Sequence, residues 1–278
     1  DVGQVILLNC KNITVKNLRL NDVQYGIEIV NSKDCVVNNC QLNESGIFVY
    51  VSNYITIRDS NLTQSGILLK MANYCTILNN SICGNDDTGI QILYSSHNTI
   101  ALNTITDRTY GIKLEYSARN VIVKNNISNN SVGIYFYSST NNTIYLNVFR
   151  NNSVSSPGGN LWSYPAKVRY AYKGKQFVNY LGNYWDKYGG TDGDGDGIGD
   201  EPYEIGDGIV DPAPLMEPPY NYLTPPIIGV ISPPNGSWIG GTVEINVPVI
   251  DEGVGVSYVL FGAGRDILSF SANGAGTI

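Results

Sequence analysis

The sequence has a single histidine and an odd number of cysteines, which limits the soft metal sites it can form. The five cysteines are Cys10, Cys35, Cys40, Cys75 and Cys83. A copper or zinc site needs Cys or His ligands at matched spacing, and no such pattern surrounds His97. Cys35 and Cys75 fall in one column of the repeat described below, two coils and thus about 9 to 10 Å apart, which is beyond disulfide reach. We interpret the cysteines mostly as buried thiols and His97 as a turn residue beside Arg119, one coil further on.

Basic residues are scarce, and long apolar runs are absent. The chain has 17 Lys and Arg against 24 Asp and Glu, with a net charge of −7 and a pI of about 4.7. Without a basic stripe, a nucleic-acid partner is not expected. No apolar run approaches the length of a membrane span. The chain begins at Asp1 without an initiator Met or a signal peptide, so we expect a mature or excised piece of a secreted precursor.

A short glycine phrase recurs through the first 150 residues. The pattern Gly-Ile-x-apolar begins at Gly26, Gly46, Gly66, Gly89, Gly111 and Gly133, so successive glycines are 20, 20, 23, 22 and 22 residues apart. A repeat of this length is typical of a solenoid, with a degenerate first coil starting near Gln4.

Two apolar columns keep a fixed distance from each glycine. Eleven residues after it stand Val37, Ile57, Ile77, Ile100, Ile122 and Ile144, with Val15 in the first coil. Five residues later stand Leu42, Leu62, Ile82, Ile105, Ile127 and Phe149, with Leu20 in the first coil. All length variation falls between the second column and the next glycine. One corner of each coil therefore absorbs every insertion.

The units are strands rather than helices. Apolar residues alternate with period two after each glycine, as in Ile27 and Ile29, and β-branched residues are frequent. A leucine-rich repeat would show the L-x-x-L-x-L-x-x-N frame, which is absent. The repeat predicts an all-β parallel β-helix of about seven coils over residues 1–150.

Polar residues also form columns. One contains Cys10, Ser32, Ser52, Ala72, Ser95, Ser117 and Ser139, and another contains Asn80, Asn103, Asn125 and Asn147. Because coils stack about 4.8 Å apart, like residues can form hydrogen-bonded ladders at the turns. We interpret these residues as structural.

Sequons suggest a location outside the cytoplasm. N-x-S/T begins at Asn12, Asn43, Asn61, Asn79, Asn126, Asn129, Asn141, Asn151 and Asn235. An Asn-rich repeat generates some of these by chance, but together with the low Lys content they favour a secreted or surface glycoprotein.

The repeat spacing is lost after Phe149, and residues 151–211 predict a cap that closes the stack and carries an acidic loop. Loop positions one, three, five and nine are Asp192, Asp194, Asp196 and Asp200, and position seven, Ile198, can offer its backbone carbonyl. Gly197 at position six permits a sharp turn. Position twelve is Tyr203 rather than the Glu of an EF-hand. The spacing predicts a structural Ca²⁺ site completed by Glu201, Glu204 or Asp207; the alternative is a solvated acidic turn without metal.

Several phrases together resemble one family. SSTNNTIYLNVF (138–149), GNYWDKYGGTDGDGDGIGDEPY (182–203) and DPAPLMEP (211–218) are similar to NosD-like proteins. The resemblance covers residues 1 to about 220. It implies a right-handed parallel β-helix of the carbohydrate-binding and sugar-hydrolase group, which is abundant among archaeal surface proteins. The family is named after a periplasmic copper-processing protein, but no residues here match a copper site.

The remaining chain differs in composition. Residues 212–226 contain six prolines and predict a stiff linker. Residues 227–278 contain about four strand-like runs and resemble half of an Ig-like surface domain. Such a sandwich needs more strands, so either the chain continues or a neighbour completes the sheet.

Two surfaces are candidates for function. The outer face of the first strand of each coil is apolar and aromatic, with Phe48, Tyr50, Leu68, Leu93, Tyr135 and Tyr137. Packing against a neighbouring subunit or the capping segment is favoured over glycan stacking and over catalysis. Outside the acidic loop, the best acid cluster lies in the variable corner, where Asp86 and Asp87 are expected to neighbour Asp107 and Arg108 one coil on. These are weak catalytic candidates, because solvated loop charges explain them more simply.

The sequence therefore predicts a non-enzymatic, Ca²⁺-stabilised extracellular scaffold of a surface layer or filament. Its expected partners are copies of itself or further surface-protein segments, held through the apolar face and the unfinished Ig-like sheet. The alternative is a carbohydrate-active β-helix protein, either a lyase or hydrolase or a glycan-binding module.

Overall fold

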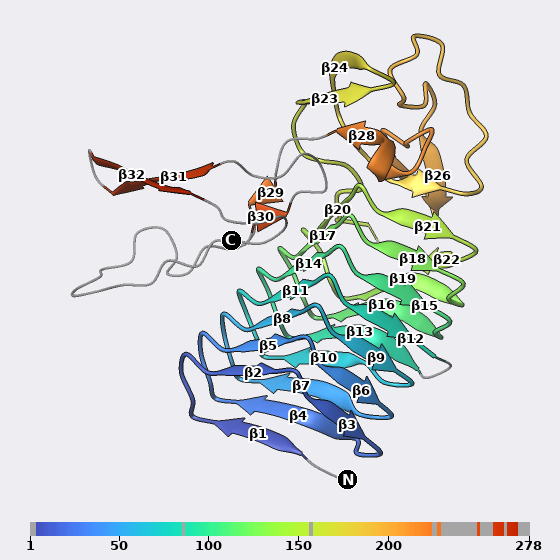
Figure 1. The fold of residues 1–278 in the computed structure, drawn as a ribbon. Coiled ribbons are helices and arrows are strands. Elements are labelled where there is room, and N and C mark those ends of the chain that lie inside the picture. Colours follow the sequence, from blue (N-terminus) through green and yellow to red (C-terminus); the bar gives the residue numbers. More distant parts are fainter. Residues whose placement is uncertain are drawn as a thin grey trace.

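The chain folds into a parallel β-helix in which each coil adds one strand to each of three sheets (Figure 1). The computed structural model describes residues 4–84, 87–155, 158–223, 227–228, 249–250, 258–263 and 266–271. The all-β prediction of about seven stacked coils is confirmed.

The strands are named by sheet. Sheet I contains β1 (Val5–Leu8), β4 (Tyr25–Val30), β7 (Gly46–Tyr50), β10 (Ile67–Lys70), β13 (Thr88–Leu93), β16 (Tyr110–Glu115), β19 (Val132–Tyr137) and β22 (Ser153–Ser155). Sheet II contains β2 (Thr14–Lys16), β5 (Val36–Asn38), β8 (Thr56–Arg58), β11 (Thr76–Leu78), β14 (Thr99–Ala101), β17 (Val121–Val123) and β20 (Thr143–Tyr145). Sheet III contains β3 (Arg19–Asn21), β6 (Gln41–Asn43), β9 (Asn61–Thr63), β12 (Ser81–Cys83), β15 (Thr104–Thr106), β18 (Asn126–Ser128), β21 (Val148–Arg150) and β25 (Tyr184–Trp185).

The predicted apolar columns form the core. Strands pair in register, so Ile77 lies between Ile57 and Ile100, and Ile82 lies over Leu62. All members of both columns are buried, including those of the first coil. Apolar side chains of one column thus stack on one another along the whole β-helix. Their burial stabilises the stacking of successive coils.

The predicted polar ladders are also present. Ser95 N–H donates to Ser117 Oγ at 3.1 Å, and Ser117 N–H donates to Ser139 Oγ at 3.0 Å. In the asparagine ladder, the backbone N–H and the Nδ2 of Asn103 both donate to Asn125 Oδ1, at 2.9 and 3.0 Å. A second ladder that the sequence analysis overlooked consists of Asn98, Asn120, Asn142 and Asn160. Its signal in the sequence is an Asn nine residues after each of three glycines.

Coils turn through residues with left-handed backbone conformation. His97 has φ 60° and its ring stacks on Tyr74 at 4.9 Å, while Arg119 one coil on has φ 57°. The interpretation of His97 as a turn residue is confirmed. Cys35, Cys40 and Cys75 are buried free thiols as expected, and burial raises the pKa of Cys75 to about 12. Cys10 and Cys83 are half-buried free thiols.

An eighth, partial coil lies in the segment that the sequence analysis assigned to the cap. β22 extends sheet I, β25 extends sheet III, and Leu161 bridges Thr143 of sheet II. Trp162 and Trp185 take the place of the aliphatic core residues, and the Trp185 ring stacks on Phe149 at 4.3 Å. Large indoles thereby close the apolar end of the stack.

The cap is built from short antiparallel strands above this coil (Figure 1). β23 (Val168–Tyr172) pairs with β24 (Lys175–Asn179) and with β28 (Tyr222–Leu223), which follows the 3-10 helix η1 (Pro219–Asn221). A second hairpin joins β26 (Tyr203–Gly206) and β27 (Ile209–Asp211).

Residues 212–223, the described part of the predicted linker, pack against the cap. Leu215 is fully buried and bridges both Tyr184 and Ile198. The prolines hold this segment extended so that it can cross the cap.

Four short strands are described beyond the cap. β29 (Ile227–Ile228) pairs with β30 (Val249–Ile250), and β31 (Tyr258–Ala263) forms an antiparallel hairpin with β32 (Asp266–Ser271). Most of the predicted Ig-like segment lies outside the described residues. Within the described chain, no helix is long and apolar enough to cross a membrane.

Candidate functional site

The variable corner between sheets III and I contains a notch. From the second apolar column to the next glycine, residues 42–46 and 62–66 advance by only four positions, whereas 20–26 advance by six and 82–89 by seven. Two consecutive short corners therefore lie between longer ones. Because each coil rises about 4.8 Å, this difference leaves a recess running along the stack.

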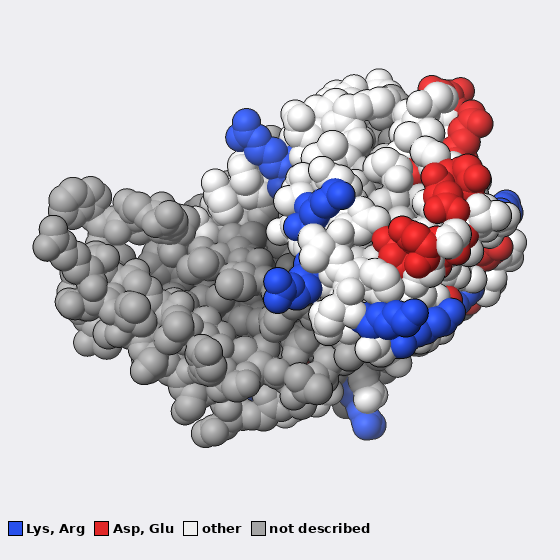
Figure 2. All heavy atoms as spheres, turned by 90° about the horizontal axis from the view of Figure 1, so that it is seen from above, with Lys and Arg blue, Asp and Glu red and all other residues white. Residues whose placement is uncertain are grey.

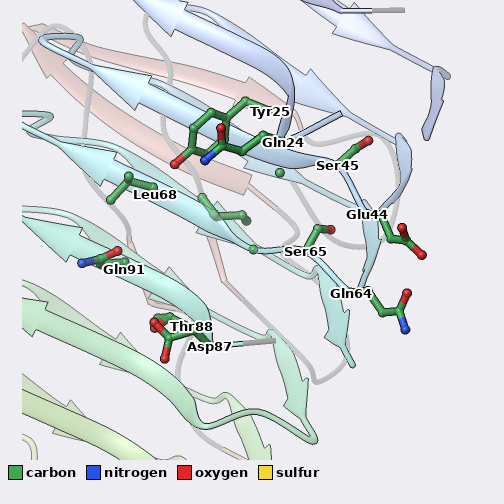
Figure 3. Close-up of a pocket in the computed structure, with 13 residues that line it drawn as sticks. Gln24, Tyr25, Glu44, Ser45, Gln64, Ser65, Leu68, Asp87, Thr88 and Gln91 are labelled. Atoms are coloured by element: carbon green, nitrogen blue, oxygen red, sulfur yellow. The ribbon is translucent and has the colours of Figure 1, made fainter. Parts of the chain in front are cut away.

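The recess has a volume of about 720 Å³ and extends over four coils (Figure 3). It is lined by Gln24, Tyr25, Glu44, Ser45, Gly46, Gln64, Ser65, Gly66, Ile67, Leu68, Asp87, Thr88 and Gln91. We call this set the corner notch. Its rim carries amides and carboxylates, and it includes no Lys or Arg among the described residues.

Two hydroxyl groups in the corner notch are left without a partner. Ser65 is 6% exposed, and its Oγ has no hydrogen bond within the described part of the chain. The same holds for Thr88 Oγ1. Buried hydroxyls are normally hydrogen-bonded, because burying one without a partner costs free energy.

Aromatic rings continue from the notch across sheet I. The Tyr25 ring stacks on Phe48 at 5.1 Å, and Phe48 stacks on Tyr50 at 5.8 Å. Lys70 Nζ lies 5.6 Å from the centre of the Tyr50 ring. Gln91 Nε2 donates to Glu115 at 2.6 Å, which fixes one amide at the far end of the notch.

The apolar face predicted on sheet I is largely half-buried. Phe48, Tyr50, Leu68, Leu93 and Tyr135 are half-buried, and Tyr137 is 48% exposed. The sequence analysis missed its continuation at the next turn, where Val51, Met71, Tyr94 and Tyr116 are exposed. A polar cluster interrupts this face, because Lys113 Nζ lies 3.2 Å from Glu115 Oε1. Nothing among the described residues covers it.

The described members of the weak catalytic candidates differ in exposure. Asp87 lines the corner notch and Asp107 is exposed, but Arg108 is buried. The Arg108 Nη2 donates to the carbonyls of Ser65 and Cys83, and the latter bond is 2.9 Å. Asp86 lies outside the described residues.

The acidic loop of the cap brings three carboxylates together. Ligand atoms of Asp192, Asp194 and Asp196 lie within 4.8 Å of one another. Oxygens bound to one Ca²⁺ at about 2.3 to 2.6 Å can be no further apart than about 5 Å, so the spacing suits a shared cation. Asp192 oxygens also accept the N–H groups of Asp196 and Gly197, at 3.1 and 3.0 Å.

The other two predicted ligands lie beside this group. Asp200 Oδ2 accepts Gly193 N–H at 2.8 Å and the Thr191 hydroxyl at 2.9 Å, so it orders the loop. The Ile198 side chain is buried, and its N–H donates to Asp196 Oδ1 at 2.7 Å. Seen from the cap end, acidic side chains gather on one side of the molecule (Figure 2).

The loop backbone is packed into the cap. The Tyr170 hydroxyl donates to the Asp196 carbonyl at 2.9 Å, and Asn179 Nδ2 donates to Asp196 Oδ2 at 2.8 Å. Gly197 has φ 89°, and a Cβ there would meet the rings of Tyr172 and Tyr222 at 2.8 Å. These rings fix the turn that directs the three carboxylates toward one point.

The predicted glycosylation sites differ in exposure. Exposed side chains are those of Asn12, Asn43, Asn61, Asn79, Asn129, Asn141 and Asn151. Asn126 is half-buried, and Asn235 lies outside the described residues.

Several solved structures are similar to the chain. A double mutant of the periplasmic alginate epimerase AlgG matches with 22% identity and a TM-score of 0.47, over 50% of this chain and 36% of that one. The A-module of a mannuronan C-5 epimerase of Azotobacter vinelandii matches with 13% identity and a TM-score of 0.28, over 52% of this chain and 63% of that one. The Dettilon tailspike protein matches with 8% identity and a TM-score of 0.29, over 57% of each chain.

The AlgG structures are considerably longer than the aligned part, which spans 36% to 39% of the first three matched chains. No curated protein matches the chain. The family model described as "Periplasmic copper-binding protein (NosD)" matches residues 5–190, which include every coil of the β-helix. The chain belongs to the NosD family.

Proposed function

We propose that the protein is a non-catalytic glycan-binding β-helix that holds a sugar chain in the corner notch. The observation that supports this most is the pair of unpartnered hydroxyls, Ser65 Oγ and Thr88 Oγ1, in a recess rimmed by amides. Sugars recognised by proteins need many neutral donors and acceptors, together with an aromatic or apolar surface for the ring. Gln64 and Gln91 supply amides, and Tyr25 supplies the ring surface.

The notch favours an uncharged glycan over an acidic one. Glu44 and Asp87 are the two charged side chains of its described lining, and both are acids. They would repel a uronate polymer, because no Lys or Arg of the described lining offsets them. The notch runs over four coils, about 14 Å, so a short run of sugar rings fits along the stack.

Substitution of Gln64 tests this site. Gln64 is exposed at the rim, so Gln64→Ala should fold normally yet weaken binding of a neutral oligosaccharide about tenfold through the loss of one or two hydrogen bonds. Calorimetric titration with neutral gluco-, manno- and galacto-oligosaccharides, and with alginate fragments as the acidic comparison, measures the affinity. Gln41→Ala is the matched control, since Gln41 is exposed on sheet III of the neighbouring coil. Equal affinity of both variants, or no binding of any neutral glycan by the native chain, would refute the proposal.

We further propose that the acidic loop holds Ca²⁺ and stabilises the cap. Three carboxylates form a hard oxygen site, which suits Ca²⁺ rather than copper. Among the described residues, they are also the one group of three or more His, Cys, Asp or Glu side chains placed to share an ion. The copper in the family's name therefore does not fit the ligands that this chain brings together.

Removal of the cation should loosen the cap. A cation at one hundred times its dissociation constant stabilises the folded state by about 2.7 kcal/mol, so excess EDTA should lower the melting temperature of the native chain. Asp194→Asn should abolish both the Ca²⁺ dependence and sensitised terbium emission, whereas Asp22→Asn, at an exposed position of the first coil, should leave both intact. Terbium binding by the Asp194 variant equal to that of the native chain would remove this loop as the site.

A location in the periplasm or outside the cell accords with these roles. The description of the matching family model is periplasmic. Assembly into a surface layer or filament through sheet I or the Ig-like segment stays a prediction, as does glycosylation.

A further inference from the structure

Arg108 reaches back under the corner notch rather than into solvent. It follows the second-column residue Ile105 by three positions, as Asn130 follows Ile127. Its own N–H donates to Asn130 Oδ1 at 3.1 Å, so it belongs to an inward-facing polar column. Arg108 is 3% exposed, and within that column its long side chain stands where the later coils have asparagine.

The contacts of Arg108 connect three coils. Its Nη2 donates to the carbonyl of Ser65, two coils back, and to the Cys83 carbonyl, one coil back. The Cys83 carbonyl also accepts the Gln64 N–H at 2.8 Å. One guanidinium thus holds the backbone that presents Gln64 and Ser65, both of which line the notch.

We infer that Arg108 is a positioning residue that sets the depth of the corner notch and aims the Ser65 hydroxyl at a bound glycan. This inference rests on the proposed function for its ligand. If the side chain at this position only continued the ladder, asparagine would be sufficient, and burying a charged group there would bring no advantage. The reach of Arg108 toward Ser65 and Cys83 is the feature that asparagine would lack. A shorter side chain would remove the guanidinium donor from the Ser65 carbonyl and leave the Cys83 carbonyl with the Gln64 N–H alone.

The test replaces Arg108 with the residue that its column favours. Arg108→Asn keeps the backbone bond to Asn130 and matches the side chains of Asn130 and Asn152, but it cannot reach Ser65. Hydrogen exchange measured by mass spectrometry should show faster amide exchange over residues 62–70. The exchange rates of coils at least four coils away should not change. Arg119→Asn is the matched control, because Arg119 is exposed on the next coil and Asn141 aligns with it. Exchange over residues 62–70 equal to that of the native chain would overturn the positioning role, whether or not any glycan binds.

The binding arm separates the two proposals. If the neutral glycan binds the native chain, Arg108→Asn should weaken it at least tenfold. Arg108→Asn and Ser65→Ala should also be non-additive, because both act on one hydroxyl. Additive losses would mean that Arg108 does not act through Ser65 and would overturn this inference while leaving the glycan site in place. A native chain that binds no glycan would end the proposed function, and the exchange result would still decide the role of Arg108.

Discussion

Replacing Asn125 with leucine is expected to lower the free energy of unfolding by about 3 to 5 kcal/mol, because it leaves several buried polar groups without partners. The Asn125 side chain is buried. Its Oδ1 accepts two hydrogen bonds from Asn103, while its Nδ2 donates to the Ile100 carbonyl at 2.9 Å and to Asn147 Oδ1 at 2.9 Å. Leucine has the same number of side-chain heavy atoms with the same branch at Cγ, so it is the apolar residue closest in shape, and the loss of polar partners dominates the change. Urea unfolding followed by circular dichroism measures the change.

The next residue provides the control. Asn126 is half-buried on the outer side of β18, so Asn126→Leu should change stability by less than about 1 kcal/mol. Similar losses in the two variants would show that the ladder contributes no more than the half-buried Asn126 amide outside it. A small loss in Asn125→Leu alone would show that the backbone groups find other partners.

The core could be predicted from sequence because its signal is strictly periodic. A fixed offset from glycine places Ile77, Ile82 and their counterparts in the interior of each coil. The stacking of one apolar column on itself follows from this periodicity alone. The same spacing also indicated the corner notch, since the corner segments 42–46 and 62–66 are shorter than those of the neighbouring coils. It was interpreted as tolerance to insertion, because a difference in length acquires a shape only when neighbouring coils are compared.

The direction of a side chain and the folding of the cap were harder to predict. Arg108 was grouped with solvated acids by its charge, although its place three residues after Ile105 puts it in the inward column. Leu215 lies in a proline-rich segment without periodicity, and its burial depends on contacts with Tyr184 and Ile198 that no local pattern encodes. Spacing predicts repeating contacts well, whereas contacts made once require the tertiary structure.

The asparagine ladder ends in a carboxylate. Asn147 donates to Asn183 Oδ1, and Asn183 donates to Asp211 Oδ2 through its N–H at 2.7 Å and its Nδ2 at 3.1 Å. Trp185 Nε1 and Ala213 N–H also donate to Asp211, at 2.9 and 3.1 Å. The last member of such a ladder receives bonds with no further coil to donate to, and an ionised Asp is a pure acceptor. Asp211 therefore suits the last position of the ladder, because an ionised carboxylate has no donor group that would need a partner in a further coil.

This arrangement predicts that stability falls as the pH rises. Burial raises the pKa of Asp211 from 3.8 to about 6, despite the hydrogen bonds that lower it. The folded chain therefore holds the proton more tightly than the unfolded chain does, so the contribution is fully present below pH 3.8 and is lost as the pH rises through 6. A shift of about two units corresponds to about 3 kcal/mol.

Asp211→Asn isolates this contribution, since asparagine does not titrate. Its amide would face the Ala213 N–H and cost a constant amount at every pH, so the informative quantity is the difference in unfolding free energy between the native chain and the variant. That difference should shrink by about 3 kcal/mol between pH 3.5 and pH 7.5. Asp207→Asn, at an exposed cap position, should give a flat difference. A flat difference for Asp211→Asn would mean that its four donors hold the carboxylate ionised throughout, so that the ladder ends in a charge that the cap fully compensates.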